Sequence, residues 1–243
     1  ASGNHATLPC VRRPRVGILA TGDELRLPGS ALEAGQIIAS NSYGVGAVLA
    51  SYGGDIIDLG IAADSRDALN EKLDAALAAQ CDVIITLGGA SVGDHDLVKP
   101  VFEARGMTLD FWKIAMRPGK PLMSGRFGDV LMIGLPGNPV SSMVCAHVFC
   151  APVVAALAGR KHAVRQEIAQ LTAPLGTNGP REHYMRAIAT RGDKALAVDV
   201  FDNQDSSVLS LFAKANCLVI RPPHDPQRAA GQPVTIQWIK SPD

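Results

Sequence analysis

The chain has 243 residues, of which 47% are hydrophobic and 19% charged, so it has ample apolar material for a globular core. Lys and Arg together number 23, as do Asp and Glu, and the formal net charge is zero. A neutral chain gives no electrostatic reason to bind nucleic acid or an anionic membrane surface, so we expect neither as a partner. The five scattered cysteines form no CxxC pair, which favours reduced thiols in a cytoplasmic protein over disulfides or zinc.

Strand-like and helix-like segments alternate through the first two thirds of the chain. In chain order we expect a strand at Val16–Ala20, a helix at Asn41–Tyr52, a strand at Ile56–Gly60, a helix that begins at an Asp64-Ser65 cap and ends near Ala79, a strand at Val83–Leu87, a helix at Leu97–Arg105, strands at Leu109–Ala115, Pro121–Ser124 and Val130–Ile133, and a helix at Pro139–Ala158. This alternation predicts an α/β fold with a parallel or mixed sheet between two helical layers. Ligands of such folds bind beyond the carboxyl ends of the strands.

The pattern changes after Arg160. Short alternating stretches separated by Gly, Pro, Asn and Asp predict a small all-β domain, for example at Ala195–Val200 and Cys217–Arg221. We therefore expect an N-terminal segment at residues 1–14, an α/β domain at 15–160 and a β-barrel-like domain at 161–243.

One stretch, Val140–Gly159, has no charged residue and is long enough to cross a membrane. Its Ala and Ser content, together with His147 and Pro152, favours a helix buried in the core or at a subunit contact instead. We expect no membrane span, and we expect this helix to contribute to a homodimer.

The strongest local signal is a glycine-rich turn, Gly88–Asp96, directly after the apolar run Val83–Leu87. Such a turn lets the backbone approach a ligand and aims N–H groups at phosphate or another oxyanion. Oxygen-rich acidic sites favour Mg²⁺, which makes Asp96 the better functional candidate, whereas Asp94 suits the cap of the next helix. The groups of this turn that we expect to bind substrate are Gly88, Gly89, Ser91 and Gly93.

Two further acidic positions have both a structural and a functional interpretation. Glu24 lies in the turn Thr21-Gly22-Asp23-Glu24, whose charges favour the start of a helix but whose side chain also suits a metal or a substrate. Asp64 is most simply a helix N-cap, and a cap at a strand's carboxyl end can face the same cleft.

Basic groups gather in a rigid loop between the two glycine-rich turns. Lys113, Arg117 and Lys120 fall within eight residues, and a Pro-Gly-Lys-Pro sequence holds the last two in place. The planar fork of Arg suits an oxyanion, while Lys supplies a compact charge. We expect this loop to bind an anionic substrate.

The second glycine-containing turn, Pro136–Pro139, precedes the closing helix. Its prolines restrict the backbone, and the helix start presents N–H groups to a ligand. Asn138 and Ser141 add neutral donors, and no histidine–acid pair in the sequence points to Ser141 as a nucleophile. We expect Pro136, Asn138, Pro139 and Ser141 to contact substrate.

Four motifs, in this order, make the chain similar to a known family. TGDEL at 21–25, GGASVGDHD at 88–96, MRPGKPL at 116–122 and GLPGNPVSS at 134–142 resemble the MoeA-type molybdopterin molybdotransferases, which include the E domain of gephyrin. A weaker similarity continues through 179–188, 205–218 and 230–236. The resemblance implies an α/β domain of molybdopterin-binding type followed by a β-barrel-like domain.

The resemblance also implies an activity and a site. The activity is Mg²⁺-dependent insertion of molybdate into adenylylated molybdopterin with release of AMP, assisted by positioning and electrostatics. By position in the motifs, the metal ligands are Glu24, Asp64 and Asp96, and the catalytic residues are Asp64, Asp96, Lys113 and Arg117. Relatives carry two further domains before the TGDEL strand, where this chain has residues 1–14. They form elongated dimers, so we expect a homodimer and a transient contact with the adenylyltransferase that supplies the substrate.

Three alternatives share part of this pattern. A MogA-type molybdopterin adenylyltransferase lacks the β domain and the GLPGNP turn, and a CinA-like nucleotide-processing protein usually has a GGLGPT-like loop in place of GGASVG. A non-catalytic scaffold, the role that gephyrin adds, needs none of the acidic and basic groups at Glu24, Asp64, Asp96 and Lys113. Their presence favours an enzyme lineage.

Overall fold

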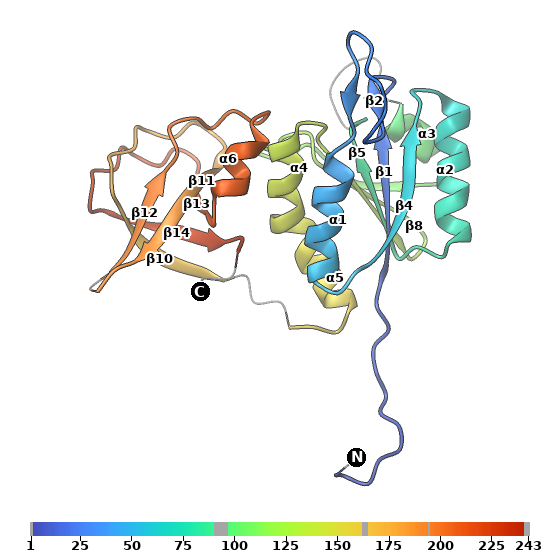
Figure 1. The fold of residues 1–243 in the computed structure, drawn as a ribbon, viewed down its shortest axis with the longest axis horizontal. Helices are drawn as coiled ribbons and strands as arrows, with labels where there is room; N and C mark the ends of the chain where they lie inside the picture. Colours follow the sequence, from blue (N-terminus) through green and yellow to red (C-terminus); the bar gives the residue numbers. More distant parts are fainter. Residues whose placement is uncertain (1, 90–96, 162–164, 194, 241–243) are drawn as a thin grey trace.

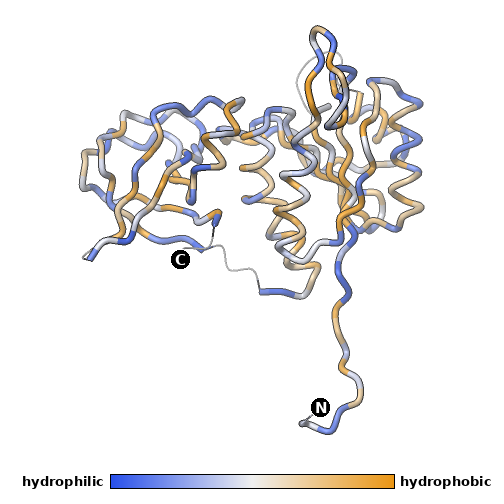
Figure 2. The backbone as a smooth tube through the Cα atoms, in the orientation of Figure 1, coloured by the Kyte–Doolittle hydropathy of each residue, from blue (hydrophilic) through white to orange (hydrophobic). Residues whose placement is uncertain are grey.

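The fold combines an α/β part with a β barrel that lies beside it (Figure 1). The structure is a computed structural model that describes residues 2–89, 97–161, 165–193 and 195–240. Hydrophobic residues concentrate in the central strands, while the outer helix α2 alternates between hydrophobic and hydrophilic turns (Figure 2).

A six-stranded mixed sheet forms the centre of the α/β part. Its strands, in spatial order, are β4 (Asp55–Ala62), β1 (Arg15–Thr21), β5 (Val83–Leu87), β9 (Val130–Leu135), β8 (Met123–Phe127) and β6 (Thr108–Trp112). The first four strands are mutually parallel, and β8 runs antiparallel to both of its neighbours. All five residues of β5 are buried because helices cover both faces, which confirms the strand predicted from its continuous apolar run.

Helices cover the two faces of this sheet. One face packs on α1 (Asn41–Ser51) and on the closing helix, which comprises α4 (Pro139–Cys145), the π-helical turn η1 (Ala146–Cys150) and α5 (Ala151–Leu157); the other packs on α2 (Arg66–Ala78) and α3 (Val98–Ala104). The cap of α2 differs from the prediction, because Ser65, and not Asp64, accepts a hydrogen bond from the Ala68 amide at 3.2 Å. Ser65 is one residue closer in sequence to the first N–H groups of α2, which have no acceptor within the helix.

The closing helix is the one helix of the described residues that is long and apolar enough to cross a membrane. Within the chain, 61% of its most apolar stretch is already buried, as the prediction of a core helix requires. The helix widens to the π-helical turn just before Pro152, because Pro152 lacks the N–H that would bond to the Val148 carbonyl.

The C-terminal part is a closed barrel of β10 (Gln166–Leu171), β11 (Glu182–Arg191), β12 (Leu196–Val200), β13 (Cys217–Arg221) and β14 (Pro233–Trp238). It closes because β12 pairs with both β10 and β11. The short helix α6 (Leu209–Lys214) connects β12 to β13. Residues from the barrel also enter the core of the α/β part, among them Tyr184, Phe212 and Leu218.

Two short pairings complete the fold. The strands β2 (Leu25–Arg26) and β3 (Ile37–Ile38) pair in parallel above the carboxyl end of β1. The strand β7 (Met116–Arg117) leaves the α/β part and pairs with the start of β11 in the barrel. The sequence analysis predicted none of β2, β3, β7 and β10, because each pairs through contacts that local periodicity does not show.

Candidate functional site

A cavity of about 440 Å³ lies at the carboxyl ends of β1, β5 and β9, where the predicted glycine-rich turns meet. We call it the sheet-edge cavity. Its walls include Thr21, Glu24, Leu25, Ile37, Ile38, Asn41, Leu87, Gly88, Gly137, Asn138, Pro139 and Ser207. It therefore brings together four of the residues predicted from sequence, namely Glu24, Gly88, Asn138 and Pro139.

The glycines after β5 are required by the close approach of β1 at Gly88 and of α3 at Gly89. Gly88 and Gly89 have φ angles of +92° and +63°, in the left-handed region that L side chains rarely adopt. A Cβ on Gly88 would lie 2.7 Å from the Thr21 carbonyl oxygen, and one on Gly89 would lie 2.3 Å from Val98. The other predicted residues of this turn, Ser91, Gly93 and Asp96, lie outside the described residues.

One residue of the cavity wall, Thr21, carries a buried hydroxyl. Thr21 is only 5% exposed, and its Oγ1 has no hydrogen-bond partner among the described residues. Leaving such a group unpaired costs about 1–3 kcal/mol, so a ligand that bonds to it recovers that energy. The sequence analysis noted the turn that contains Thr21 but not its side chain; the signal was a small polar residue at the end of a buried apolar strand.

The acidic residues lie on two neighbouring loops. The Asp23 carboxylate accepts a hydrogen bond from the Asp64 amide at 3.0 Å, and the Gly22 amide donates to the Ala62 carbonyl at 3.2 Å. Glu24 lines the sheet-edge cavity, whereas Asp64 lines none of the cavities described here. No group of three metal-ligating side chains occurs among the described residues, and the predicted third ligand, Asp96, is not one of them.

A second cavity, of about 620 Å³, lies between the α/β part and the barrel. We call it the basic-loop cavity. It is lined by Arg117, Pro118, Gly119, Lys120, Pro121, Ser141, Arg181, Asp202, Gln204, Asp205 and Ser206. The pairing of β7 with β11 forms it, because it brings Arg117 into register with His183 of the barrel. Three predicted residues, Arg117, Lys120 and Ser141, meet here.

Lys113 lies apart from this group. Its Nζ is 3.8 Å from the centroid of the Trp112 ring, a cation–π contact, and it lines neither cavity. Its φ angle is +71°, which places its backbone in the left-handed region.

The proline turn separates the two cavities. The Asn138 side chain, at the N-cap of α4, donates from Nδ2 to Ser206 Oγ at 3.0 Å, and the Val140 amide donates to the Ser206 carbonyl at 3.0 Å. On the opposite side, Asn41 Nδ2 donates to the Gly137 carbonyl at 2.7 Å. Pro136, the first residue of this turn (Pro136–Pro139), is buried. The wall between the cavities thus joins both parts of the chain.

A buried arginine holds the barrel loop that carries Ser206. Arg186 is 1% exposed, and its guanidinium donates to the carbonyls of Asn203 and Val208 at 3.0 and 3.1 Å. The Gln204 side chain accepts from the Arg186 amide at 2.9 Å and donates to the Arg186 and Phe201 carbonyls. These contacts keep residues 202–207 against the proline turn.

The barrel's share in the cavity walls was missed by sequence reasoning. Every site residue predicted from sequence lies in the α/β part, between Glu24 and Ser141. Arg181, Ser206 and Ser207, which follow that part in the chain, nevertheless line the cavities. Their distance in sequence from the α/β motifs hid this role.

Positive charge dominates around His183. The side chain is buried, and burial together with Arg117, Arg221, Arg181 and Arg186 lowers its pKa to about 4. It is therefore neutral near pH 7, and the guanidinium groups of Arg117 and Arg181, which line the basic-loop cavity, are the charges of this set that an anion meets.

The structure belongs to the class of two-part proteins in which an α/β domain with a mixed sheet is followed by a β barrel, and both parts line the basic-loop cavity. Residues 17–156 match the family model described as a probable molybdopterin binding domain. Residues 169–239 match the MoeA C-terminal region, domain IV. The chain belongs to the MoeA family of molybdopterin-binding proteins.

Proteins similar in sequence and structure match nearly the whole length of this chain. It is 35% identical over 240 residues to the molybdopterin molybdenumtransferase of Haemophilus influenzae, covering 98% of this chain and 59% of that protein. The Bacillus subtilis protein of the same name is 34% identical over 243 residues, which is 56% of its length. A molybdopterin biosynthesis MoeA structure from Pyrococcus horikoshii superposes with a TM-score of 0.80 at 25% identity, covering 94% of this chain and 55% of that one. The chain thus spans a little over half the length of these relatives.

Proposed function

We propose that this chain binds adenylylated molybdopterin and molybdate and contributes to molybdate insertion with release of AMP. The observation that carries the proposal is the pair of adjoining cavities on either side of the proline turn. One is lined by Thr21, whose buried hydroxyl has no partner among the described residues, and the other is lined by three cations. The names of the similar proteins support the same reaction class.

The sheet-edge cavity suits the pterin. Leu25, Ile37 and Ile38 supply apolar lining for a flat ring, and Thr21 and Asn41 add polar residues to the same cavity wall. The basic-loop cavity suits an oxyanion, since Arg117 and Lys120 make no side-chain hydrogen bond or ion pair with the described residues. A substrate that spans the turn would use both.

Glu24 and Asp64 are the described residues that would hold Mg²⁺, with Asp96 as the predicted third ligand. Their carboxylate oxygens are the donors that this cation prefers, and the hydrogen bond from the Asp64 amide to Asp23 keeps their loops adjacent. When bound, Mg²⁺ supplies a positive charge that polarises a phosphoanhydride. Arg117 would hold the oxyanion. Lys113 stays a proposed catalytic residue on the motif resemblance alone, because it lies on Trp112 and lines neither cavity.

The assembly around this activity also remains a proposal. A homodimer would complete the site, with the closing helix or its surroundings as one contact, and the adenylyltransferase would deliver the substrate through a transient contact in the cytoplasm. Sedimentation at micromolar concentration tests the dimer, and a monomer there would contradict it.

A direct assay tests the proposed reaction. The chain is incubated with adenylylated molybdopterin, molybdate and Mg²⁺, alone and fused to the N-terminal domains of a relative, and AMP is measured. We expect AMP release that depends on Mg²⁺ and is abolished by Asp96→Asn. If both the chain alone and the fusion bind the substrate but neither releases AMP, the proposed molybdate insertion is wrong and only a binding function is supported.

A further inference from the structure

We propose that a third cavity, between α1 and the barrel, binds a small aromatic carboxylate. The cavity has a volume of about 540 Å³, and its walls come from α1, the closing helix, α6 and the residues that follow β14. We call it the α1–α6 cavity. Ala47, His147 and Lys240 line it but line neither of the other two cavities, so the inference does not depend on the proposed function.

Space remains between these elements because α1 contributes mostly small side chains to the cavity wall. Gly44, Ala47 and Ser51 follow one another at intervals of three or four residues, so they lie on one face of the helix. The barrel contributes larger apolar groups, including Leu209 and Phe212 of α6, which lies beside α4 in Figure 1. A volume of this size suits a small molecule, since ligand cavities in proteins span about 300–1,000 Å³.

One residue of the wall is a buried imidazole. His147 of η1 is 8% exposed and makes no hydrogen bond or ion pair with any other residue that the structure describes. Burial lowers its pKa to about 4, so the ring is neutral near pH 7 and has one N–H donor and one acceptor nitrogen. Buried polar groups are nearly always hydrogen-bonded, so a ligand that bonds to this ring supplies the missing partner.

The charge of the cavity favours a ligand with a single negative charge. Lys240 is the one charged residue among the described residues that line it. Its ammonium group donates to the Ala213 carbonyl and has further N–H donors for a ligand. The Asn216 carbonyl accepts hydrogen bonds from the Ile239 and Lys240 amides at 3.0 and 3.2 Å, which fixes the backbone at this point. One cation suits a carboxylate better than a polyanion such as a nucleotide.

The rings in the wall favour an aromatic body for this ligand. The rings of His147 and Phe212 have centroids 6.0 Å apart, and their planes differ by 34°. Aromatic rings prefer offset or edge-on contacts with one another, and a flat ligand ring can make such contacts with this pair. The ligand would therefore pack its rings on Phe212, exchange a hydrogen bond with His147 and direct its carboxylate to Lys240.

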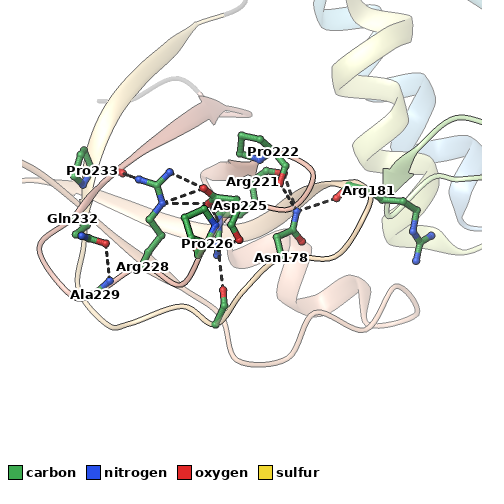
Figure 3. A network of polar contacts seen from close by, with 11 residues as sticks. Asn178, Arg181, Arg221, Pro222, Asp225, Pro226, Arg228, Ala229, Gln232 and Pro233 are labelled. Carbon is green, nitrogen blue, oxygen red and sulfur yellow. Dashed lines mark hydrogen bonds and ion pairs between the residues drawn. The ribbon is translucent and has the colours of Figure 1, made fainter.

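The polar network of the barrel is a contrasting case (Figure 3). Arg221 and Asp225 are 2% and 6% exposed and form a buried ion pair, and Arg228 contacts the same carboxylate at 2.7 Å. Arg221 also donates to the Gly176 carbonyl at 3.1 Å. These buried groups satisfy one another and stabilise the barrel loops without a ligand. The imidazole of His147 has no comparable partner among the described residues.

Calorimetry on the full chain tests the site. The probe is 2-naphthoate; 2-naphthylmethanol has the same rings without the charge, and octanoate has the charge without the rings. Ala47→Trp fills the cavity, and Ala50→Trp is its matched control, because Ala50 is exposed on the same helix but lies outside the cavity. Lys240→Gln removes the cavity's charge, and Lys214→Gln removes one on α6 outside it.

We expect 2-naphthoate to bind the wild type about 10-fold more tightly than either other probe. Ala47→Trp should abolish this binding with little change in Tm, and Lys240→Gln should weaken it about 10-fold through the loss of a charge-assisted hydrogen bond. Both controls should bind like the wild type. His147→Phe keeps a ring beside Phe212 but removes the N–H, so we expect binding about 3- to 10-fold weaker. His147→Gln, which retains a donor, should bind more tightly than His147→Phe.

Several results would overturn the inference. Equal affinity in Ala47→Trp and Ala50→Trp would place the ligand elsewhere on the chain. Equal affinity of the wild type for all three probes would contradict an aromatic carboxylate, and an equal loss in Lys240→Gln and Lys214→Gln would contradict the contact at Lys240. A wild type that does not bind 2-naphthoate would refute the ligand site. If Ala47→Trp then dissociates a dimer in sedimentation, a second copy of the chain covers the cavity instead.

Discussion

Asn138 donates a hydrogen bond to Ser206 at 3.0 Å, and this contact crosses the junction between the α/β part and the barrel. Asn138 lines the sheet-edge cavity and Ser206 the basic-loop cavity, so the pair forms the wall between them. The turn that the sequence motif predicts is thus completed by a residue almost seventy positions later in the chain.

The first prediction concerns that contact. Asn138→Ala and Ser206→Ala should each lower the free energy of unfolding by about 1 kcal/mol or less, since the bond is partly solvated. The double variant should lose less than the sum of the two, because either change removes the same bond. Denaturant unfolding measures the three values. Strict additivity would show that the two side chains do not interact in solution.

The buried hydroxyl of Thr21 gives a second prediction. Thr21→Val removes, at nearly constant volume, an Oγ1 that has no partner within the described part of the chain, so we expect an unchanged or higher Tm together with weaker molybdopterin binding. Thr86→Val is the matched control, because Thr86 in β5 also has a buried Oγ1 without a partner among the described residues but lies outside the cavities. Equal pterin affinity in the two variants would contradict a ligand contact at Thr21.

A third prediction is that a substitution of Arg117 weakens anion binding without lowering thermal stability much. Arg117→Ala should weaken molybdate or phosphate binding by about 1.5–3 kcal/mol while lowering Tm little, because its exposed side chain contributes little packing. Arg126→Ala on β8, outside the cavities, controls for the loss of one surface charge. Calorimetry at constant ionic strength measures the anion affinity of both variants. An equal loss of affinity in both would show that the effect comes from net charge and not from a contact at Arg117.

The pH dependence of stability follows from two buried histidines. Burial lowers the pKa of His147 to about 4, and burial with neighbouring arginines does the same for His183. The unfolded chain, with histidine pKa near 6.5, then binds more protons than the folded chain between these values. Stability is complete above pH 6.5 and falls as pH drops toward 4, by up to about 3 kcal/mol for each residue.

Substitution of each histidine tests whether it causes this loss of stability at low pH. His183→Gln should flatten the fall in Tm between pH 6.5 and pH 4, and His147→Gln should flatten it independently, because the two side chains lie in different elements. Thermal unfolding across that range gives the measurement. A slope unchanged in both variants would assign the acid sensitivity to other groups.

Local sequence was sufficient for most of the α/β part. The run Val83–Leu87 is a strand of the same bounds in the structure, because five consecutive apolar residues between turn signals suit a strand buried on both faces. Gly88 was predicted to lie in a turn whose backbone approaches a ligand; the structure shows that the Thr21 carbonyl also leaves no room there for a side chain. The end of β1 and the start of α4 were predictable for the same reason: neighbouring residues determine them.

Tertiary structure decided which side chains share a cavity. No local pattern distinguishes Ser65 from Asp64 as the cap, since both are good acceptors and only the path of the chain selects one. Lys113 and Arg117 are four residues apart, yet the first lies on Trp112 and the second pairs with the barrel. Arg181 and Ser206 reach the site only because β7 joins β11 and the proline turn meets residues 202–207. Such long-range pairing depends on the packing of the whole chain, which the periodicity of a short segment does not encode.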